Sequence, residues 1–205
     1  MHKHSHVLFA AASVLALGGL FLAPAARGRD DDDKEAAMKT AAARDAVLKL
    51  VGDLGNEDAA RKEAADIAKK HDIKYVMNQF KPRDKGGLGV GPKPGAAAQD
   101  SIELELLALA KKPLGPGALA AQQGDLEKMA QVAEAIALIA PGYAANENRK
   151  PSEIKDWNRY TEDMLRQSKD LAAALKSNDP KKVQTAANTL NGSCNACHTA
   201  FRDNN

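Results

Sequence analysis

Two stretches near the carboxyl end carry the most regular alternation of apolar and polar residues in the chain. From Ile154 to Leu175 and from Val183 to Phe201, apolar or small residues return at alternating steps of three and four. This spacing puts them on one face of an α-helix, so it predicts two helices packed antiparallel along a shared seam. Asp179-Pro180 favours a helix start between them, because aspartate caps free amides and proline fits the first helical position. The seam positions are Ile154, Trp157, Thr161, Met164, Ser168, Leu171 and Leu175 in the first helix, and Val183, Ala187, Leu190, Cys194, Cys197 and Phe201 in the second.

The rest of the chain also favours helices, since it is rich in alanine and leucine and only 4% of the residues are aromatic. Four further helical segments are expected, over residues 34–52, 56–80, 100–111 and 118–140. Residues 81–95 are dense in glycine, proline and lysine. They predict an irregular stretch, either a mobile linker or a loop wrapped over another element. Because no segment shows the alternation typical of a β-strand, the predicted fold class is all-α.

The first 25 residues have the composition of a secretory signal peptide. Lys3 and three histidines precede the apolar run from Val7 to Leu22, and Ala23-Pro24-Ala25 is a small-residue cleavage site. We therefore expect residues 1–25 to be removed and residues 26–205 to form a single periplasmic domain. An uncleaved membrane anchor is the second possibility, because the apolar run is only slightly short for a membrane span.

The candidate chemistry lies in Cys194-Asn195-Ala196-Cys197-His198, which contains the only two cysteines of the chain. C-x-x-C-H is the spacing for covalent haem attachment. On a helix the two sulfurs share one face, where they can form thioethers to two vinyl groups of one porphyrin while His198 reaches the iron. Three alternatives stay open: a disulfide, which is awkward within one helix; a zinc site, which lacks ligands; and a thioredoxin-type dithiol, which would follow a strand.

A C-x-x-C-H at the end of an all-helical chain resembles the class II c-type cytochromes, the family of cytochrome c prime. The resemblance covers Ser152 to Arg202. It implies a four-helix bundle with one haem c held by Cys194 and Cys197, with His198 as the proximal iron ligand. Homodimers are common in the family and are possible here. Besides C-x-x-C-H, the residues that carry the resemblance are Trp157, Asp179 in a turn, Gly192, Phe201 and Arg202, the last expected beside the haem propionates.

The resemblance requires four bundle helices. We expect the segments 34–52 and 56–80 to join the two carboxyl-terminal helices in the bundle. Residues 81–150 then form an insertion between the second and third bundle helices, and its two helical segments pack outside.

The first of these segments offers a candidate distal side of the haem. Arg44 and Leu48 lie on one stripe with Ala37, Ala41 and Val51. The resemblance implies that Arg44 meets a haem propionate and that Leu48 covers the iron, which would then be five-coordinate because leucine cannot ligate. Alternatively, Arg44 snorkels at the bundle edge. Other distal ligands considered are Met38, Met77, Met164 and His71, although methionines on apolar faces are more often core residues.

These features favour an exported mono-haem protein that transfers single electrons, binds diatomic gases such as NO and CO, or does both. A six-coordinate carrier with a methionine ligand and a haem-free helical interaction module are the alternatives. We expect no enzyme, since a peroxidase needs a distal acid–base group and His71 alone could serve. The 29 basic and 27 acidic residues are well mixed and indicate neither nucleic acid nor a membrane surface as partner. Electron transfer would require a redox partner protein, which the sequence does not identify.

Overall fold

The computed structural model of the protein describes residues 27–144 and 150–202, and all regular secondary structure in these ranges is helical. The all-α prediction is confirmed, whereas the predicted signal peptide lies outside the described residues. Within the described ranges no helix is long and apolar enough to span a bilayer. The elements are α1 (Arg27–Asp53), α2 (Glu57–Lys70), α3 (Ile73–Met77), η1 (Asn78–Phe80), η2 (Arg83–Lys85), α4 (Ile102–Lys111), α5 (Pro116–Ile139), η3 (Ala140–Tyr143), α6 (Pro151–Lys176) and α7 (Pro180–Phe201).

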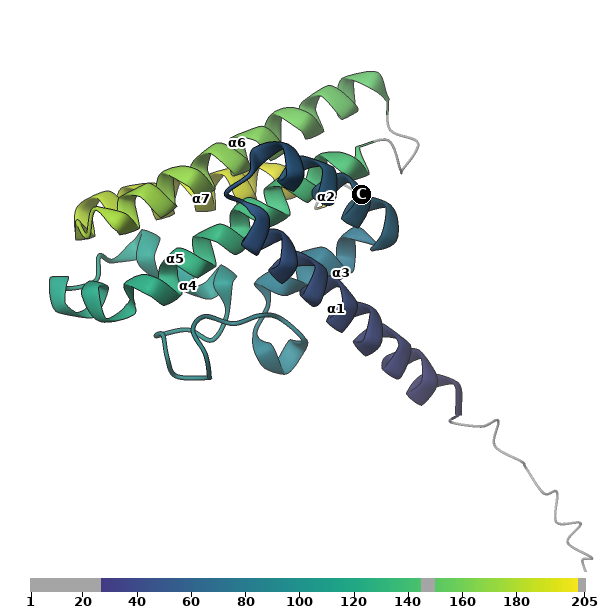
Figure 1. Cartoon of the computed structure of the whole chain (residues 1–205), viewed down its shortest axis with the longest axis horizontal. Helices are drawn as coiled ribbons and strands as arrows, with labels where there is room; N and C mark the ends of the chain where they lie inside the picture. The colour runs from purple at the N-terminus through teal and green to yellow at the C-terminus, as the bar shows by residue number, and fades with distance from the viewer. Residues whose placement is uncertain (1–26, 145–149, 203–205) are drawn as a thin grey trace, which may run out of the picture.

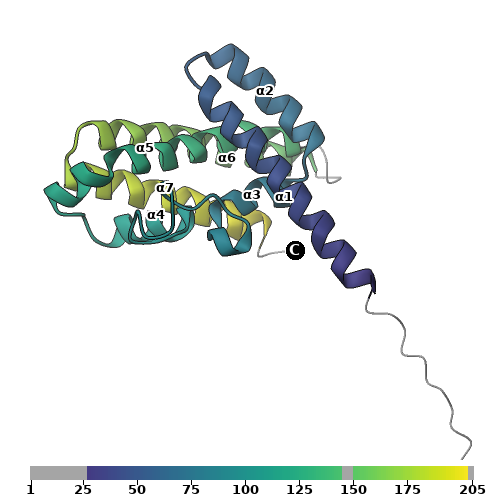
Figure 2. The same cartoon turned by 60° about the horizontal axis from the view of Figure 1, so that its bottom comes forward.

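Helices α4 to α7 form a four-helix bundle. Helix α5 packs along α6, α6 along α7 and α7 along α4, and these helices run lengthwise through the body of the molecule (Figures 1 and 2). The predicted seam between α6 and α7 is confirmed, since Leu171, Leu175 and Leu190 in it are fully buried. The carboxylate of Asp179 accepts hydrogen bonds from the backbone N–H groups of Lys181 and Lys182 at 2.9 and 3.2 Å, as expected of a helix cap.

Helices α1 and α2 pack on each other and lie across α5, outside the bundle (Figure 2). The expectation that residues 34–52 and 56–80 supply two bundle helices, with 81–150 as an external insertion, is therefore wrong: α4 and α5 take these two places. Helix α5 is apolar around most of its circumference and needs neighbours on two sides. Helices α1 and α2 cover one of these sides and α6 the other. The buried residues of α5 are Leu119, Leu126, Met129, Ala130, Val132, Ala133, Ala135, Ile136, Ala137 and Ile139.

Helix α1 packs through a different stripe from the one predicted. Ala37 and Ala41 are exposed, and Arg44 and Leu48 are half-buried. Both stripes have helical spacing, but the observed one avoids placing the guanidinium in the core. The buried residues are Thr40, Ala43, Val47 and Leu50.

The predicted helix over residues 56–80 is broken at His71 and Asp72. Asn56 caps α2, accepting a hydrogen bond from the N–H of Ala59 at 3.2 Å. Helix α2 ends at Lys70, and His71 is extended (φ −123°, ψ 135°). Asp72 then starts α3 by accepting a hydrogen bond from the N–H of Lys74 at 2.9 Å. After the break, residues 73–80 lie near the carboxyl-terminal end of α7. This segment consists of α3 followed by η1 and is called α3–η1.

Residues 81–101 form a packed loop, the second of the two forms expected for this stretch. Arg83 organises it: its Nε lies 2.9 Å from Oδ1 of Asp100, and its guanidinium also donates to the carbonyls of Val90 and Gly91. The Val90 side chain is 2% exposed and joins the hydrophobic core. Gly87 is required by space, because a Cβ there would lie 1.6 Å from the carbonyl oxygen of Lys81.

Candidate haem site

Helix α7 carries the C-x-x-C-H in its last two turns. Cys194 and Cys197 are half-buried, are not joined by a disulfide and pack against the hydrophobic core, so the motif faces inward as its stripe predicted. Burial raises the pKa of the Cys194 thiol to about 12, with smaller contributions from Cys197 and Glu103. This thiol is therefore neutral at physiological pH.

Cys194, Cys197 and His198 all line one open cavity of about 550 Å³, the large cavity. Trp157 and Met164 of α6 line it beside them. Its opposite wall is α3–η1, followed by Lys81, and Glu103 of α4 completes the lining. The volume falls in the range of about 300–1,000 Å³ that is usual for cofactor and ligand pockets.

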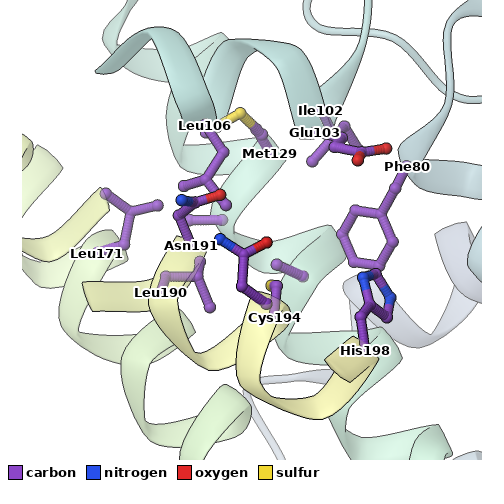
Figure 3. Close-up of a pocket in the computed structure, with 13 residues that line it drawn as sticks. Phe80, Ile102, Glu103, Leu106, Met129, Leu171, Leu190, Asn191, Cys194 and His198 are labelled. Atoms are coloured by element: carbon purple, nitrogen blue, oxygen red, sulfur yellow. The ribbon is translucent and has the colours of Figure 1, made fainter. Parts of the chain in front are cut away.

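A second, smaller cavity of about 60 Å³ lies between α4, α5 and α7, and Cys194 and His198 line this one too. Phe80 and Glu103 border both cavities, and Figure 3 shows the Phe80 ring beside the His198 imidazole. A porphyrin is far too large for the smaller cavity, so it would occupy the large cavity or displace Phe80. The apolar walls of the smaller cavity come from Ile102, Leu106, Met129, Ala130, Ala133, Leu171 and Leu190.

An aromatic cluster supports the end of α7. The indole Nε1–H of Trp157 donates to the carbonyl of Ala140 at 2.8 Å. The Phe201 ring meets Trp157 edge to face, with centroids 5.1 Å apart and planes at 74°, and it meets Tyr160 at 5.9 Å. The two aromatics that the resemblance singled out, Trp157 and Phe201, are thus in direct contact beside the motif.

Arg202 contacts the candidate iron ligand. Its Nη1 lies 3.1 Å from Nδ1 of His198. A guanidinium can only donate, so in this contact Nδ1 is the acceptor. Arg202 also lines the large cavity, together with Lys74 and Lys81, and these three residues give the cavity a basic rim.

Arg44 and Leu48, in contrast, lie apart from this site and line neither cavity. The guanidinium of Arg44 donates to the carbonyl of Gly86 at 2.8 Å and to that of Gly87 at 3.4 Å, so it holds the packed loop. Leu48 packs half-buried on α1. The place that the resemblance assigned to this helix is taken by α3–η1.

Of the four other candidate distal ligands, two line the large cavity and two do not. Met77 and Met164 line the large cavity. Met38 is 66% exposed on α1. His71 lines neither cavity, and its backbone carbonyl accepts a hydrogen bond from the Tyr143 hydroxyl at 2.7 Å.

Sequence reasoning did not assign Lys74, Phe80, Lys81 or Glu103 to the site. The break at Asp72 was the available indication, because an aspartate followed by an apolar pair at Val76 and Met77 is typical of a new helix start. Over residues 27–144 and 150–202 there is no group of three or more histidine, cysteine, aspartate or glutamate side chains that could hold a metal ion alone.

An all-α bundle with a C-x-x-C-H facing a cavity from its last helix agrees with the resemblance to the class II c-type cytochromes. Residues 111–202, which contain α5, α6 and α7, match the family model for Cytochrome C'. This part of the chain is similar to the cytochrome c prime family, in agreement with the resemblance that the motif indicated. No curated protein and no solved structure matches the chain. Because the match includes α5, it agrees with the position of that helix inside the bundle.

Proposed function

We propose that the protein is an exported c-type cytochrome that carries one covalent haem and transfers single electrons. Cys194 and Cys197 are the attachment points and His198 is the proximal iron ligand. The observation that carries this proposal is that all three residues line one cavity of about 550 Å³ and lie within the part of the chain that matches the family model. The signal-peptide composition of residues 1–25 supports export, and a periplasmic location is part of this proposal.

The residues of the large cavity fit a haem. Trp157, Met164 and Phe201 offer an apolar surface to the porphyrin ring. Lys74, Lys81 and Arg202 offer positive charge to two propionates, which takes over the role expected of Arg44. A haem has a matching distribution of apolar surface and charge, because its ring is apolar and its charged propionates lie at one edge.

Cys194 and Cys197 would hold the haem through two thioethers. Each S–H would add across one vinyl group, the sulfur bonding to the carbon next to the ring and the hydrogen to the terminal carbon, so that nothing is released. Once bound, the haem supplies a one-electron couple between ferric and ferrous iron. The chain then orients the ring through α7, excludes water with α6 and the α3–η1 wall, and balances the propionate charge at the rim.

Ligation also changes the contact between Arg202 and His198. A neutral imidazole that binds iron through Nε2 carries its proton on Nδ1, and that N–H cannot accept a hydrogen bond from a guanidinium. Arg202 would therefore turn away from Nδ1, and the rim position that it already occupies lets it turn toward a propionate.

The sequence favoured gas binding because Leu48 was expected to cover the iron and leave it five-coordinate. Leu48 lines neither cavity, so it does not support this function. Binding of NO or CO is therefore an outcome to be measured, not the favoured function.

The test is to produce the full chain in a host with haem-maturation machinery and to record its intact mass and absorption spectrum. We expect a Soret band and a mass gain of about 0.6 kDa, the mass of one iron protoporphyrin. C194A/C197A should lose both, whereas N195A, which changes an exposed position between the cysteines, should keep both. A colourless wild-type protein of unmodified mass would refute haem attachment and favour a haem-free helical module.

A further inference from the structure

The wall that faces the C-x-x-C-H across the large cavity lies outside the family-matched residues. It is α3–η1, and the match begins only at residue 111. We propose that Met77, on this wall, is the sixth ligand of the haem iron, opposite His198. This inference rests on the proposed haem attachment and adds the identity of the distal ligand.

The α3–η1 wall is firmly held in place. The buried amide of Gln79 donates to the carbonyl of Thr40 at 3.2 Å, which ties the wall to α1, and to the carbonyl of Tyr75 within the wall at 3.0 Å. The carbonyl of Phe80 accepts a hydrogen bond from the Ser101 hydroxyl at 2.9 Å, which ties it to the start of α4. A ligand on this wall is therefore already positioned before the haem is bound.

The wall also lies where a distal ligand must lie. Cys194, Cys197 and His198 all lie on α7, so this helix would hold the haem from one side of the cavity. A sixth ligand would then be supplied by another element that lines the same cavity, and α3–η1 is such an element. Phe80 stands directly beside His198 in Figure 3, and Met77 precedes it by three positions, one turn earlier on the same side of the wall.

Among the side chains that line the cavity, Met77 has the best combination of chemistry and position. Its thioether is a neutral donor, whereas the ammonium groups of Lys74 and Lys81 have no lone pair to offer. Met164 has the same chemistry, but it is buried in the seam between α6 and α7, where it is 9% exposed. Met77 is half-buried at the cavity itself.

Methionine ligation has a direct consequence for function. Six-coordinate iron with histidine and methionine is low-spin and has no vacant position for a gas. A methionine ligand also raises the reduction potential of the haem. The protein would then be an electron carrier that does not bind CO at equilibrium.

The experiment uses the haem-loaded full chain as wild type, M77L, M77H and the matched control M164L. In the wild type we expect sharp α and β bands in the reduced form, a strongly upfield-shifted methionine methyl resonance in the proton NMR spectrum, and no change on adding CO. M77L keeps the apolar volume and removes the sulfur. It should give a broad high-spin spectrum, lose the shifted methyl resonance, bind CO fully and show a lower midpoint potential. M164L should behave as the wild type.

M77H supplies a second donor at the same position, so it should remain low-spin with a lower potential than the wild type, and it tests the position even where M77L fails to fold. A wild type that is high-spin and binds CO, or an M77L that keeps the shifted methyl resonance, would overturn the assignment of Met77. Either result would leave haem attachment intact, because the mass gain and the Soret band measure attachment separately.

Discussion

Replacing Trp157 with phenylalanine removes one defined hydrogen bond beside the haem site. The indole Nε1–H donates to the carbonyl of Ala140 at 2.8 Å, and Ala140 is 1% exposed, so no water can replace the donor. A buried carbonyl left without a partner costs about 1–3 kcal/mol. The edge-to-face contact with Phe201 is kept in part because phenylalanine retains a ring, so most of the loss comes from the hydrogen bond.

The assay for W157F is urea unfolding of the haem-loaded protein, followed by far-UV circular dichroism because Trp157 is the sole tryptophan. With an m-value of about 2 kcal/mol per M, a loss of about 2 kcal/mol lowers the midpoint by about 1 M. Y160F is the matched control, since Tyr160 touches the same Phe201 ring from a half-buried position, and we expect a change within about 0.5 kcal/mol. Equal midpoints for W157F and the wild type, or an equal loss in Y160F, would refute the reasoning.

Three further predictions follow from the loop and the bundle. R83M leaves Asp100 without its partner, so we expect a loss of about 1–3 kcal/mol and faster proteolysis between residues 86 and 95; unchanged cleavage would show that the pair does not hold the loop. Burial raises the pKa of Glu105, so the contribution of this residue to stability is greatest below the ordinary pKa of 4.5 and falls as the pH rises through the pKa in the folded state. E105Q should therefore raise the melting temperature at neutral pH and make it less dependent on pH. A lower melting temperature of E105Q at neutral pH would contradict this prediction. R44M removes the hydrogen bonds to the packed loop, so it should destabilise the protein by about 1–2 kcal/mol and leave the midpoint potential unchanged. K81M should lower the midpoint potential, because it removes positive charge near the haem. A changed midpoint potential in R44M would show that Arg44 is a propionate partner after all.

The two carboxyl-terminal helices and the site on them could be predicted from the sequence because all of their determinants are local. Asp179-Pro180 sets the start of α7, and the steps of three and four set the buried faces of both helices. The spacing of Cys194, Cys197 and His198 sets the chemistry without reference to any other part of the chain. The family match over residues 111–202 agrees with each of these points.

The partners of the other helices could not be predicted in this way. Periodicity shows that a helix has an apolar face but not which helix covers it, and α1 and α5 both offer suitable faces. Helix α5 enters the bundle because it is apolar on two sides, whereas α1 has one narrow buried stripe that includes Ala43, Val47 and Leu50. The error about Arg44 and Leu48 follows from that choice of bundle helix.

The distal wall of the site depends on tertiary contacts. Residues 73–80 form a short run whose position is set by Gln79, which bonds back to Thr40, and by Ser101, which bonds to Phe80 from the far side of the packed loop. Such contacts join residues 21 to 39 positions apart. A pattern read over one or two helical turns contains no information about them.

The central claim is that α7 holds an iron porphyrin through two carbon–sulfur bonds. Tandem mass spectrometry of the peptide that contains residues 194–198, from protein made in a competent host, tests it most directly. The account predicts one haem attached to that peptide through both cysteines, with the bonds surviving acid extraction that removes non-covalent haem. A peptide recovered with two unmodified thiols, or with a disulfide, would contradict it.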